Sequence, residues 1–259
     1  MSQFCDRACP SDGVTEKRPV SAEQFFAPGN KAGFVRDVFD RIAGRYDLLN
    51  TVTSFGMHRR WRSRAIALTQ LPPGGTALDI ACGTGDFLPG LRKRAGSEGQ
   101  VLGLDFSVPM LAVAKEKLRK RSVDALLLRG DAEKLPFQSE SINAVTIGFA
   151  LRNLTDMERA FREMHRVLAV GGRAVALEIA RPGWWPYRPL FLLYFERLLP
   201  RLAAWFGGEE LAYRWLPASL AAFCSRRGVV THMERAGFSK VRTEDLAAGA
   251  VCIYIGEKE

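Results

Sequence analysis

The strongest constraint on the fold is a regular alternation of short apolar segments with amphipathic segments across the middle of the chain. The apolar segments, which we predict to be strands, span 76–81, 100–105, 125–131, 142–150 and 172–180. The amphipathic segments, which we predict to be helices, begin at Phe87, cover 109–120 and cover 156–168. Repeated strand and helix units of this kind require a mostly parallel sheet with helices on both faces. The sequence therefore predicts a doubly wound α/β fold.

Three regions lie outside this alternation. Residues 1–33 are polar, aperiodic and interrupted by Pro and Gly, so we expect a flexible N-terminal tail before a single domain spanning 34–259. That domain should open with N-terminal helices, because apolar residues recur there every three or four positions. The aromatic and basic segment 182–225 predicts a helical cap insertion. Segments 239–246 and 250–257, separated by an AAG turn, predict a hairpin that makes one edge of the sheet antiparallel.

The composition of the chain limits which partners the protein could bind and in which cellular compartment we expect it. The chain has 37 basic and 28 acidic residues, and its formal net charge of +9 suits nucleic acid or an anionic membrane surface. Its start lacks the basic segment and apolar stretch of a secretory signal, and its five scattered cysteines fit a reducing compartment. No apolar run approaches the roughly 20 residues that span a bilayer. We therefore expect a cytoplasmic protein, and the histidine and cysteine spacing predicts no metal site.

A glycine turn follows the first predicted strand. Segment 76–81 runs directly into CGTGD, in which Gly83 and Gly85 let the backbone turn sharply and approach a ligand. A dinucleotide fingerprint requires a third glycine where this chain has Leu88, and Asp86 places a carboxylate where a pyrophosphate would bind. The turn therefore predicts a ligand site that disfavours phosphate.

Carboxylates accompany three neighbouring strands of the predicted sheet. Asp79 precedes the glycine turn, Asp105 ends the second strand and Asp131 follows the third. Each one alone is as consistent with an ordinary turn or cap residue. Together they describe a pocket in which Asp105 accepts ribose hydroxyls, Asp131 accepts an adenine amino group, and Asp79 braces the turn or meets an ammonium. Such a pocket fits a nucleoside with positive charge, which S-adenosylmethionine supplies.

Eight segments, in order and with consistent spacing, resemble one known family. They are VFDRIAGRYDLLN, SFGMHRRWR, LDIACGTGD, GLDFSVPML, GDAEKLPF, VTIGFALRNLTD, EMHRVLAVGG and YRWLPASLAAF. From about Val38 to Gly256 the chain resembles the UbiE-like C-methyltransferases of ubiquinone and menaquinone biosynthesis, within the class I S-adenosylmethionine-dependent methyltransferases. The resemblance implies a Rossmann-like seven-stranded sheet and a methyltransferase that needs S-adenosylmethionine and no metal.

The resemblance also implies cofactor contacts at particular positions of this sequence. They fall on Thr84 in the glycine turn, on Asp105, on Asp131 and Ala132, and on Gly148. Members of the family often carry serine at the position of Gly148, so a hydroxyl contact to the cofactor is missing there.

Two further departures flank the acceptor side. The family's usual Glu-Phe-Ser is here Glu178, Ile179 and Ala180 followed by Arg181, and residues 224–226 read Cys-Ser-Arg where a proline is usual.

The acceptor that the resemblance implies is a prenylated hydroquinone, with demethylmenaquinol expected first and a methoxybenzoquinol left open. Arg152 and Asn153 follow the fourth strand, and Tyr46 lies in the RYDLLN segment. We expect Arg152 to be a fixed cation that lowers the pKa of the ring hydroxyl while water takes the proton, because arginine is a poor base. Asn153 would orient that water, and Tyr46 would wall the pocket. The competing interpretations are a surface salt bridge for Arg152, a helix cap for Asn153 and a core aromatic residue for Tyr46.

Alternative functions and partners stay open at this point. The segment 182–225 can be interpreted as an apolar lid with arginines at its rim, which predicts docking on an anionic membrane. A packed cap helix or a homodimer contact fits the same segment. A nucleic-acid methyltransferase is disfavoured. Enzymes that methylate the exocyclic amine of a base are expected to carry a Pro-Pro-aromatic motif after the fourth strand, where this chain has FALRN, and those that attack cytosine need a Pro-Cys pair, which is not present. The remaining alternatives are a methyltransferase for another lipid, such as an aminophospholipid or a sterol, and a non-catalytic S-adenosylmethionine-binding subunit of a quinone-synthesis assembly.

Overall fold

A computed structural model describes residues 22–27, 29–183, 187–198 and 209–259. Among these residues, seven strands form one sheet in the order β3-β2-β1-β4-β5-β7-β6. The strands are β1 (Thr76–Ile80), β2 (Gln100–Asp105), β3 (Leu126–Arg129), β4 (Ile142–Gly148), β5 (Leu168–Ile179), β6 (Ser239–Leu246) and β7 (Val251–Glu257). Every predicted strand is present, and the predicted fold class is confirmed.

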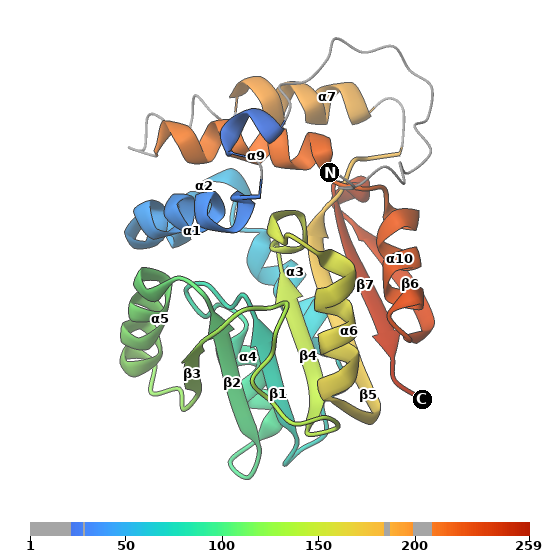
Figure 1. The fold of residues 1–259 in the computed structure, drawn as a ribbon. Coiled ribbons are helices and arrows are strands. Elements are labelled where there is room, and N and C mark those ends of the chain that lie inside the picture. Colours follow the sequence, from blue (N-terminus) through green and yellow to red (C-terminus); the bar gives the residue numbers. More distant parts are fainter. Residues whose placement is uncertain (1–21, 28, 184–186, 199–208) are drawn as a thin grey trace.

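The direction of the strands brings the predicted site residues to one edge of the sheet. Strands β3, β2, β1, β4 and β5 are parallel, so their carboxyl ends meet at the same edge, which points upward in Figure 1. Strand β7 is antiparallel to both β5 and β6. The predicted terminal hairpin is confirmed, and its second strand lies inside the sheet, between β5 and β6.

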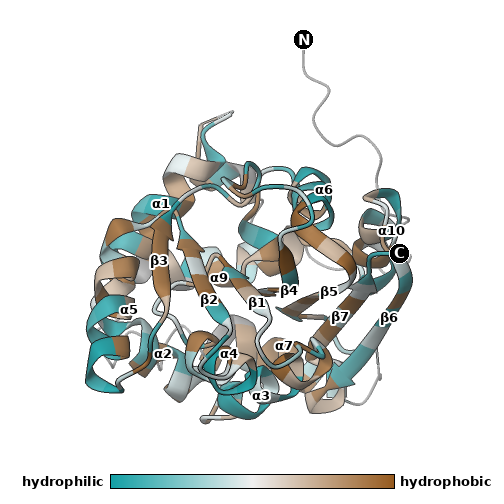
Figure 2. Ribbon diagram, turned by 90° about the horizontal axis from the view of Figure 1, so that it is seen from below, coloured by the Kyte–Doolittle hydropathy of each residue, from teal (hydrophilic) through white to brown (hydrophobic). Residues whose placement is uncertain are grey.

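Helices cover both faces of the sheet. One face carries α3 (His58–Leu68), α4 (Leu88–Ala95) and α5 (Val108–Lys120), and the other carries α6 (Met157–Val167) and α10 (Arg226–Arg235). Figure 2 shows apolar strands between these helices, with polar helix surfaces facing outward. Side chains that accept a backbone N–H fix three helix starts: Ser107 before α5, Asp156 before α6 and Ser225 before α10.

The N-terminal helices lie between the sheet and the cap. Figure 1 shows α1 (Lys31–Ile42) and α2 (Tyr46–Thr53) below the cap helices α7 (Tyr187–Leu193) and α9 (Glu210–Ala222). A short 3-10 helix, η1 (Ala22–Phe25), precedes α1. The ring of Phe25 lies 6.0 Å from that of Phe34, which orders residues well before the tail boundary expected at 33. Residues 1–21 of that tail lie outside the described residues.

The cap insertion packs its aromatic side chains inward. Phe191 of α7 and Phe195 of the following π-helical turn η4 (Tyr194–Leu198) are buried in a cluster with Ile42, Ala43 and Leu49 of the N-terminal helices. These two aromatic residues therefore hold the cap onto the domain and do not face outward as an apolar cover would. Trp184, Trp185, Trp205 and Phe206, which belong to the predicted cap segment 182–225, lie outside the described residues.

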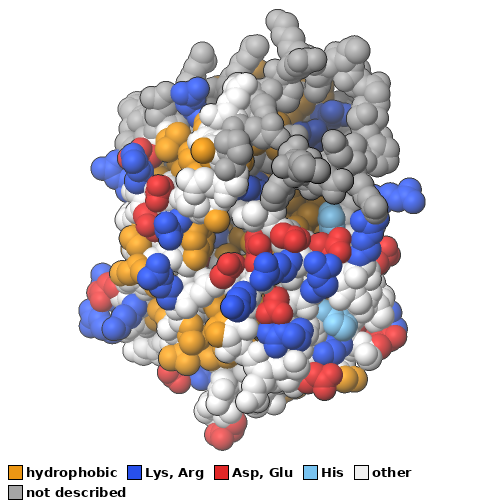
Figure 3. All heavy atoms as spheres, in the orientation of Figure 1, with side chains coloured by type: hydrophobic (Ala, Val, Ile, Leu, Met, Phe, Trp, Pro, Cys, Tyr) orange, Lys and Arg blue, Asp and Glu red, His pale blue; other side chains and the backbone are white. Residues whose placement is uncertain are grey.

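Two surface properties bear on partners. On the face of the molecule in Figure 3, basic and acidic side chains are interspersed and do not gather into one basic patch. Within the residues that the structure describes, no helix combines the length and the apolar character needed to cross a membrane.

Candidate active site

A cavity of about 580 Å³ opens at the carboxyl ends of β1, β2 and β4. Helix α1 covers it with residues such as Val35, Arg36 and Phe39. Seven of the residues selected from the sequence line this cavity: Tyr46, Gly83, Asp105, Asp131, Ala132, Gly148 and Asn153. Asp79 and Thr84 line a smaller neighbouring cavity, and Gly85 and Arg152 line neither.

The glycine turn has the backbone conformation that its residues predict. Gly83 and Gly85 have φ angles of +54° and +79°, in the left-handed region that favours glycine. A Cβ atom at Gly85 would lie 3.2 Å from Leu88 Cδ1, so this glycine supports the turn and the close approach of α4 without touching the cavity. Ala81 and Phe149, which follow β1 and β4, also have positive φ angles, and such strained residues cluster at ligand sites.

Asp105 links the glycine turn to the second strand. Its Oδ2 accepts the Gly83 N–H at 2.8 Å, and its Oδ1 accepts the Ser107 N–H at 2.8 Å. Burial raises the pKa of this carboxyl, and the backbone N–H groups of Ser107 and Gly83 oppose the rise. Each carboxylate oxygen has a second acceptor site, so Asp105 fits the paired hydroxyls of a ribose.

Asp131 and Ala132 stand at the outer end of the same cavity. Asp131 is exposed, and its Oδ1 accepts the Glu133 N–H at 2.8 Å. Ala132 is buried and lies with Leu104 and Met110 on the cavity wall. A flat apolar ring with an exocyclic amine suits this combination of apolar wall and carboxylate.

Phe87 gives a physical reason for the glycine at position 148. A Cβ atom at Gly148 would lie 2.4 Å from Cε2 of the buried Phe87 ring, too close for any side chain while that ring keeps its place. The space that a serine would use is therefore filled by Phe87, and position 148 offers the cavity its backbone alone.

The smaller cavity holds buried charged groups. Asp79 is 1 % exposed, and its Oδ1 accepts the Thr146 hydroxyl at 2.7 Å. Burial raises the pKa of Asp79 to about 8, although Thr146 and Arg62 oppose the rise. Arg62, which is 7 % exposed, lines the same cavity. In the sequence Arg62 is one of several arginines in the basic segment 58–64, and only its place on the inner face of α3 distinguishes it from its exposed neighbours.

The hydroxyl of Thr84 takes part in a polar network behind the glycine turn. Its hydroxyl donates to Asp47 Oδ1 at 2.5 Å and lies 3.1 Å from Lys117 Nζ. Lys117 also lies 2.7 Å from Asp47 Oδ2 and 2.7 Å from Asp86 Oδ1. The Thr84 side chain therefore joins α2, the turn and α5, which sequence reasoning did not foresee because Asp47 and Lys117 come from distant segments.

Arg152 forms a buried ion pair with Glu178. Its guanidinium contacts Glu178 Oε1 and donates to the Phe149 carbonyl oxygen at 3.0 Å. The Arg152 side chain is 8 % exposed and that of Glu178 is fully buried, so the competing interpretation of a surface salt bridge is wrong. The guanidinium does not line the large cavity, because Glu178 at the end of β5 holds it beside the end of β4.

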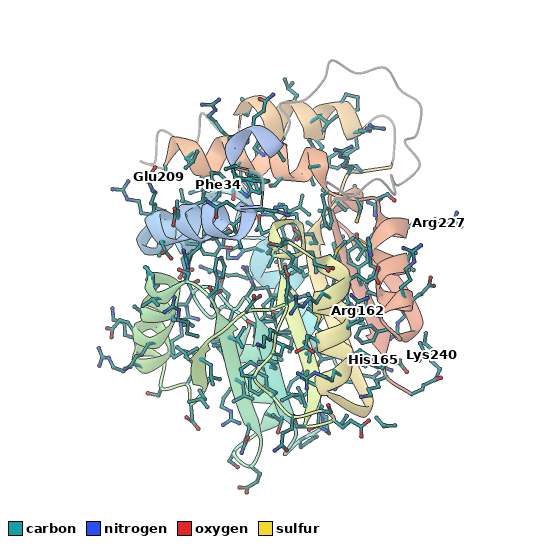
Figure 4. All side chains as sticks on the ribbon, viewed as in Figure 1. Phe34, Arg162, His165, Glu209, Arg227 and Lys240 are labelled. Atoms are coloured by element: carbon teal, nitrogen blue, oxygen red, sulfur yellow. The ribbon has the colours of Figure 1, made fainter. Side chains whose placement is uncertain are left out.

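Asn153 and Tyr46 are the predicted acceptor-side residues that do line the large cavity. Asn153 Oδ1 accepts the Trp215 indole N–H from α9 at 3.0 Å. Figure 4 marks Phe34 where α1 meets α9, and its ring lies 5.2 Å from that of Trp215. Burial raises the pKa of Tyr46, while the nearby Arg62 and Arg152 oppose the rise. Tyr46 is therefore a protonated hydrogen-bond donor at neutral pH.

The sequence departures near the acceptor side have structural partners. Arg181 donates to the carbonyl oxygens of Leu220 and Ala221 in α9. Ser225 caps α10, and Arg226 Nε lies 2.9 Å from Asp245 Oδ1. These residues fasten the cap and the terminal hairpin to the domain. Among the described residues, no group of three or more His, Cys, Asp or Glu side chains is placed to hold a metal ion.

Comparison with known proteins agrees with this geometry. The sequence profile of the ubiE/COQ5 methyltransferase family matches residues 28–258. A demethylmenaquinone methyltransferase of Desulfitobacterium hafniense is 38 % identical over 90 % of this chain and 93 % of its own length. One from Bacillus cytotoxicus is 36 % identical over 86 % of this chain and 95 % of its own length.

Solved structures share the fold. A SAM-dependent methyltransferase of Thermotoga maritima, 24 % identical, superimposes with a TM-score of 0.60 over 87 % of this chain and all of its own. One from Aquifex aeolicus, 18 % identical, gives 0.56 over 75 % of this chain and 88 % of its own. The chain therefore belongs to the ubiE/COQ5 methyltransferase family, and the ligand that its aspartate-lined cavity fits is the methyl donor S-adenosylmethionine.

Proposed function

We propose that this protein transfers a methyl group from S-adenosylmethionine to a ring carbon of demethylmenaquinol. The observation that carries the proposal is the match, over nearly the full length of both chains, to curated demethylmenaquinone methyltransferases. The cavity supports it, because about 580 Å³ has room for a cofactor and a quinol ring side by side.

In the proposed complex, Asp105 accepts the ribose hydroxyls, while Asp131 and Ala132 receive the adenine. The backbone of Gly83 and Gly148 lies where a ligand can approach closely, since neither position has a side chain. When bound, the cofactor supplies an electrophilic methyl group on a sulfonium. The protein has to hold a ring carbon in line with that group, and alignment of reactants is worth roughly 7 to 11 kcal/mol in favourable cases.

The acceptor ring becomes a better nucleophile as its hydroxyl loses a proton, and the protein can favour the anion with donors. Tyr46 offers a phenol O–H to the cavity. The oxygen of Asn153 is occupied by Trp215, so this amide offers its NH2 group. We therefore infer that Tyr46 and Asn153 donate to the developing phenolate, while water takes the proton.

Arg152 acts in this proposal as a positioning residue. Its guanidinium joins Glu178 to the Phe149 carbonyl oxygen and thereby fixes the end of β4, where Gly148 and Phe149 meet the cavity. Both contacts come from one nitrogen, Nη1, whose two N–H donors are held in the plane of the rigid guanidinium.

The direct test offers methyl-labelled S-adenosylmethionine together with one acceptor at a time. The acceptors are demethylmenaquinol, a prenylated methoxybenzoquinol, phosphatidylethanolamine and a sterol. We expect label on a ring carbon of the naphthoquinol, identified by mass spectrometry. Label on the lipid amine or the sterol would replace the proposed acceptor, and cofactor binding without transfer to any acceptor would favour a non-catalytic subunit.

A prenylated acceptor resides in a bilayer, so we also propose that the protein docks on an anionic membrane. Phe55, between α2 and α3, is 73 % exposed and has a positive φ angle. Its ring lies 6.0 Å from that of Tyr194, which directly follows α7 and its exposed Leu190 and Leu193. Exposed arginines at 59 and 60 follow Phe55 in the chain. Apolar side chains next to arginines suit an acidic lipid surface.

Vesicle flotation tests this docking surface. We expect the protein to float with phosphatidylglycerol vesicles and not with phosphatidylcholine vesicles, and Phe55→Ser to lower the bound fraction several-fold. Val170→Ser is the matched control, because Val170 is 67 % exposed at the opposite end of the sheet. Equal flotation of the Phe55 and Val170 variants would contradict the proposed surface.

A further inference from the structure

Asn153, one of the two proposed donors to the acceptor, is held by a residue of the cap insertion. It ends η3 (Leu151–Asn153), the short 3-10 helix between β4 and α6, which lies below α9 in Figure 1 and contacts it. Its Oδ1 accepts the indole N–H of Trp215 in α9 at 3.0 Å. Asn153 lines the large cavity and Trp215 does not, so the amide oxygen points out of the cavity toward the cap.

The indole N–H decides which end of the Asn153 amide faces the cavity. An indole nitrogen only donates hydrogen bonds, so it selects the oxygen of an amide and not its NH2 group. The oxygen and the nitrogen of an amide point in different directions from one carbon, so an oxygen fixed on Trp215 leaves the NH2 group for the cavity. Without that donor, the amide can turn over and present its oxygen to the ring hydroxyl instead.

Trp215, which is 4 % exposed, is itself fixed by aromatic packing. The ring centres of Phe25, Phe26 and Phe34 lie 5.8, 6.0 and 5.2 Å from that of Trp215, at interplanar angles of 70° to 74°. Edge contacts of this kind favour one orientation of each ring. A buried indole N–H also needs a partner, which Asn153 Oδ1 provides. The direction of the N–H is therefore set by the cap together with the segment that precedes α1.

Titratable groups stand on every element around Asn153. They are Tyr46 of α2, Lys31 of α1, Glu133 between β3 and β4, Arg152 of η3, Asp156 before α6, Glu178 of β5 and Arg214 of α9. Lys31 donates to the Arg152 carbonyl oxygen at 3.1 Å, and Glu133 Oε1 accepts the Thr155 N–H at 2.7 Å. Replacing Trp215 by phenylalanine changes none of these charges. A changed pH dependence of turnover in that variant would therefore report the Asn153 amide.

We propose that Trp215 is a positioning residue of the acceptor site, whose indole N–H keeps the NH2 group of Asn153 turned toward the acceptor ring. This role rests on the proposed methyl transfer to a hydroquinol. It makes the cap insertion more than a cover, because α9 sets which group of Asn153 meets the developing phenolate.

Trp215→Phe removes the indole N–H and keeps an aromatic ring in the cluster. The Asn153 amide then donates only part of the time, which favours the neutral hydroxyl of the acceptor. We expect kcat for demethylmenaquinol at pH 7 to fall about tenfold, and the profile of kcat against pH to move about one unit to higher pH. The KM for S-adenosylmethionine should stay within about twofold of wild type. An unmoved pH profile would overturn the proposed role.

A double-mutant cycle with Asn153→Ala distinguishes positioning from packing. If Trp215 acts through Asn153, Trp215→Phe should lower kcat by less than about twofold once residue 153 is alanine. A similar loss in both backgrounds would mean that Trp215 acts through packing alone.

Phe34→Leu is the matched control, because it loosens the same aromatic cluster and keeps the indole N–H. It should lower the urea midpoint of unfolding and leave the pH profile in place. A shift of the profile as large as that of Trp215→Phe would assign the effect to packing and overturn the role of the N–H.

A measurement on the wild type needs neither a folded variant nor turnover. The side-chain 15N order parameter of Asn153, measured by NMR relaxation, should be about 0.85, the value typical of rigid backbone. A value below about 0.6 would show that the amide is not held and would overturn the inference. If the wild type methylated none of the acceptors, the proposed function would be contradicted, and the order parameter would still decide whether Trp215 holds Asn153.

Discussion

The two cavities of the candidate site are built in different ways. At the adenosine end, in the large cavity, Asp105 and Asp131 already accept backbone N–H groups from their own loops, and Asp131 is exposed. In the smaller cavity, Arg62 and Asp79 are buried, and each keeps one polar atom without a partner among the described residues. The carboxylates of the adenosine end therefore have partners already, whereas the smaller cavity leaves buried polar atoms without them.

This difference separates contributions to affinity from contributions to stability. An exposed carboxylate such as Asp131 adds little to affinity because water competes for it, and it costs the fold little. Buried, unsatisfied groups such as Arg62 and Asp79 cost stability. Substitutions in the two cavities should therefore change binding and stability in different proportions.

The largest effect should come from Asp105→Ala, which removes the carboxylate that joins the adenosine end to the glycine turn. The variant loses two acceptors for ribose and also the two bonds that hold Gly83 and Ser107. We expect the affinity for S-adenosylhomocysteine, measured by calorimetry, to fall about 100- to 10,000-fold, since two charged hydrogen bonds to the ribose are worth about 1.5–3 kcal/mol each.

Asp105→Asn is the internal control for that change. An asparagine keeps one acceptor oxygen for the turn, so its loss should be smaller than that of the alanine variant. Wild-type affinity in Asp105→Ala would show that the adenosine end does not depend on this residue.

Arg152→Lys tests whether the acceptor side is independent of cofactor binding. Lysine replaces the rigid planar guanidinium by an ammonium on a flexible stem, so the end of β4 should lose its fixed position. We expect turnover to fall about 100-fold, while the affinity for S-adenosylhomocysteine stays within about threefold of wild type.

Arg162→Lys is the matched control for Arg152→Lys, because this arginine stands on the outer side of α6 in Figure 4 and pairs with Glu158 at the surface. A KM rise without a kcat loss in Arg152→Lys would contradict the positioning role. Full activity of the variant would remove Arg152 from the mechanism altogether.

The sequence predicts some parts of the site and not others. The strand alternation predicts the sheet and the shared edge, and therefore the meeting of Gly83, Asp105 and Asp131. The ion pair of Arg152 with Glu178 was missed, because the two residues come from different strands and nothing in either segment marks a partner. Arg62 was missed for a similar reason, since a basic cluster does not reveal which of its members faces inward.

Asp79→Asn should increase the stability of the protein, because it removes a carboxyl group whose burial is costly. Burial raises the pKa of Asp79 from 3.8 to about 8, so between these pH values the folded protein keeps a proton that the unfolded chain has released. This group therefore lowers the free energy of unfolding progressively as pH rises from about 4 to about 8. Asparagine does not titrate and still accepts from Thr146, so the variant should gain about 4 kcal/mol of stability on the wild type between pH 4 and pH 7, at about 1.4 kcal/mol per pH unit.

Urea unfolding of the wild type and Asp79→Asn at pH 5, 6, 7 and 8 measures this gap, which should widen in favour of the variant as pH rises. Asp124→Asn is the control, because the Asp124 side chain is 94 % exposed and its gap should stay flat. A constant or shrinking gap for Asp79→Asn would mean that the buried carboxyl is not strained in the absence of ligand.

The smallest effect should belong to Asp131→Asn, at the exposed limit of the adenosine end. The asparagine oxygen can still accept the Glu133 N–H, so the turn survives and only the acceptor for the adenine amine is lost. Because Asp131 is exposed, water replaces much of that bond, and we expect the affinity for S-adenosylhomocysteine to fall about tenfold, which corresponds to about 1.4 kcal/mol.

Replacing the adenine by hypoxanthine, which lacks the amine, should weaken binding to the wild type and leave binding to the variant nearly unchanged. Asp124→Asn, before the opposite end of β3, should retain the wild-type preference for adenine. If Asp131→Asn lost as much affinity as Asp105→Ala, exposure would not govern the strength of these contacts, and the contrast between exposed and buried groups would fail.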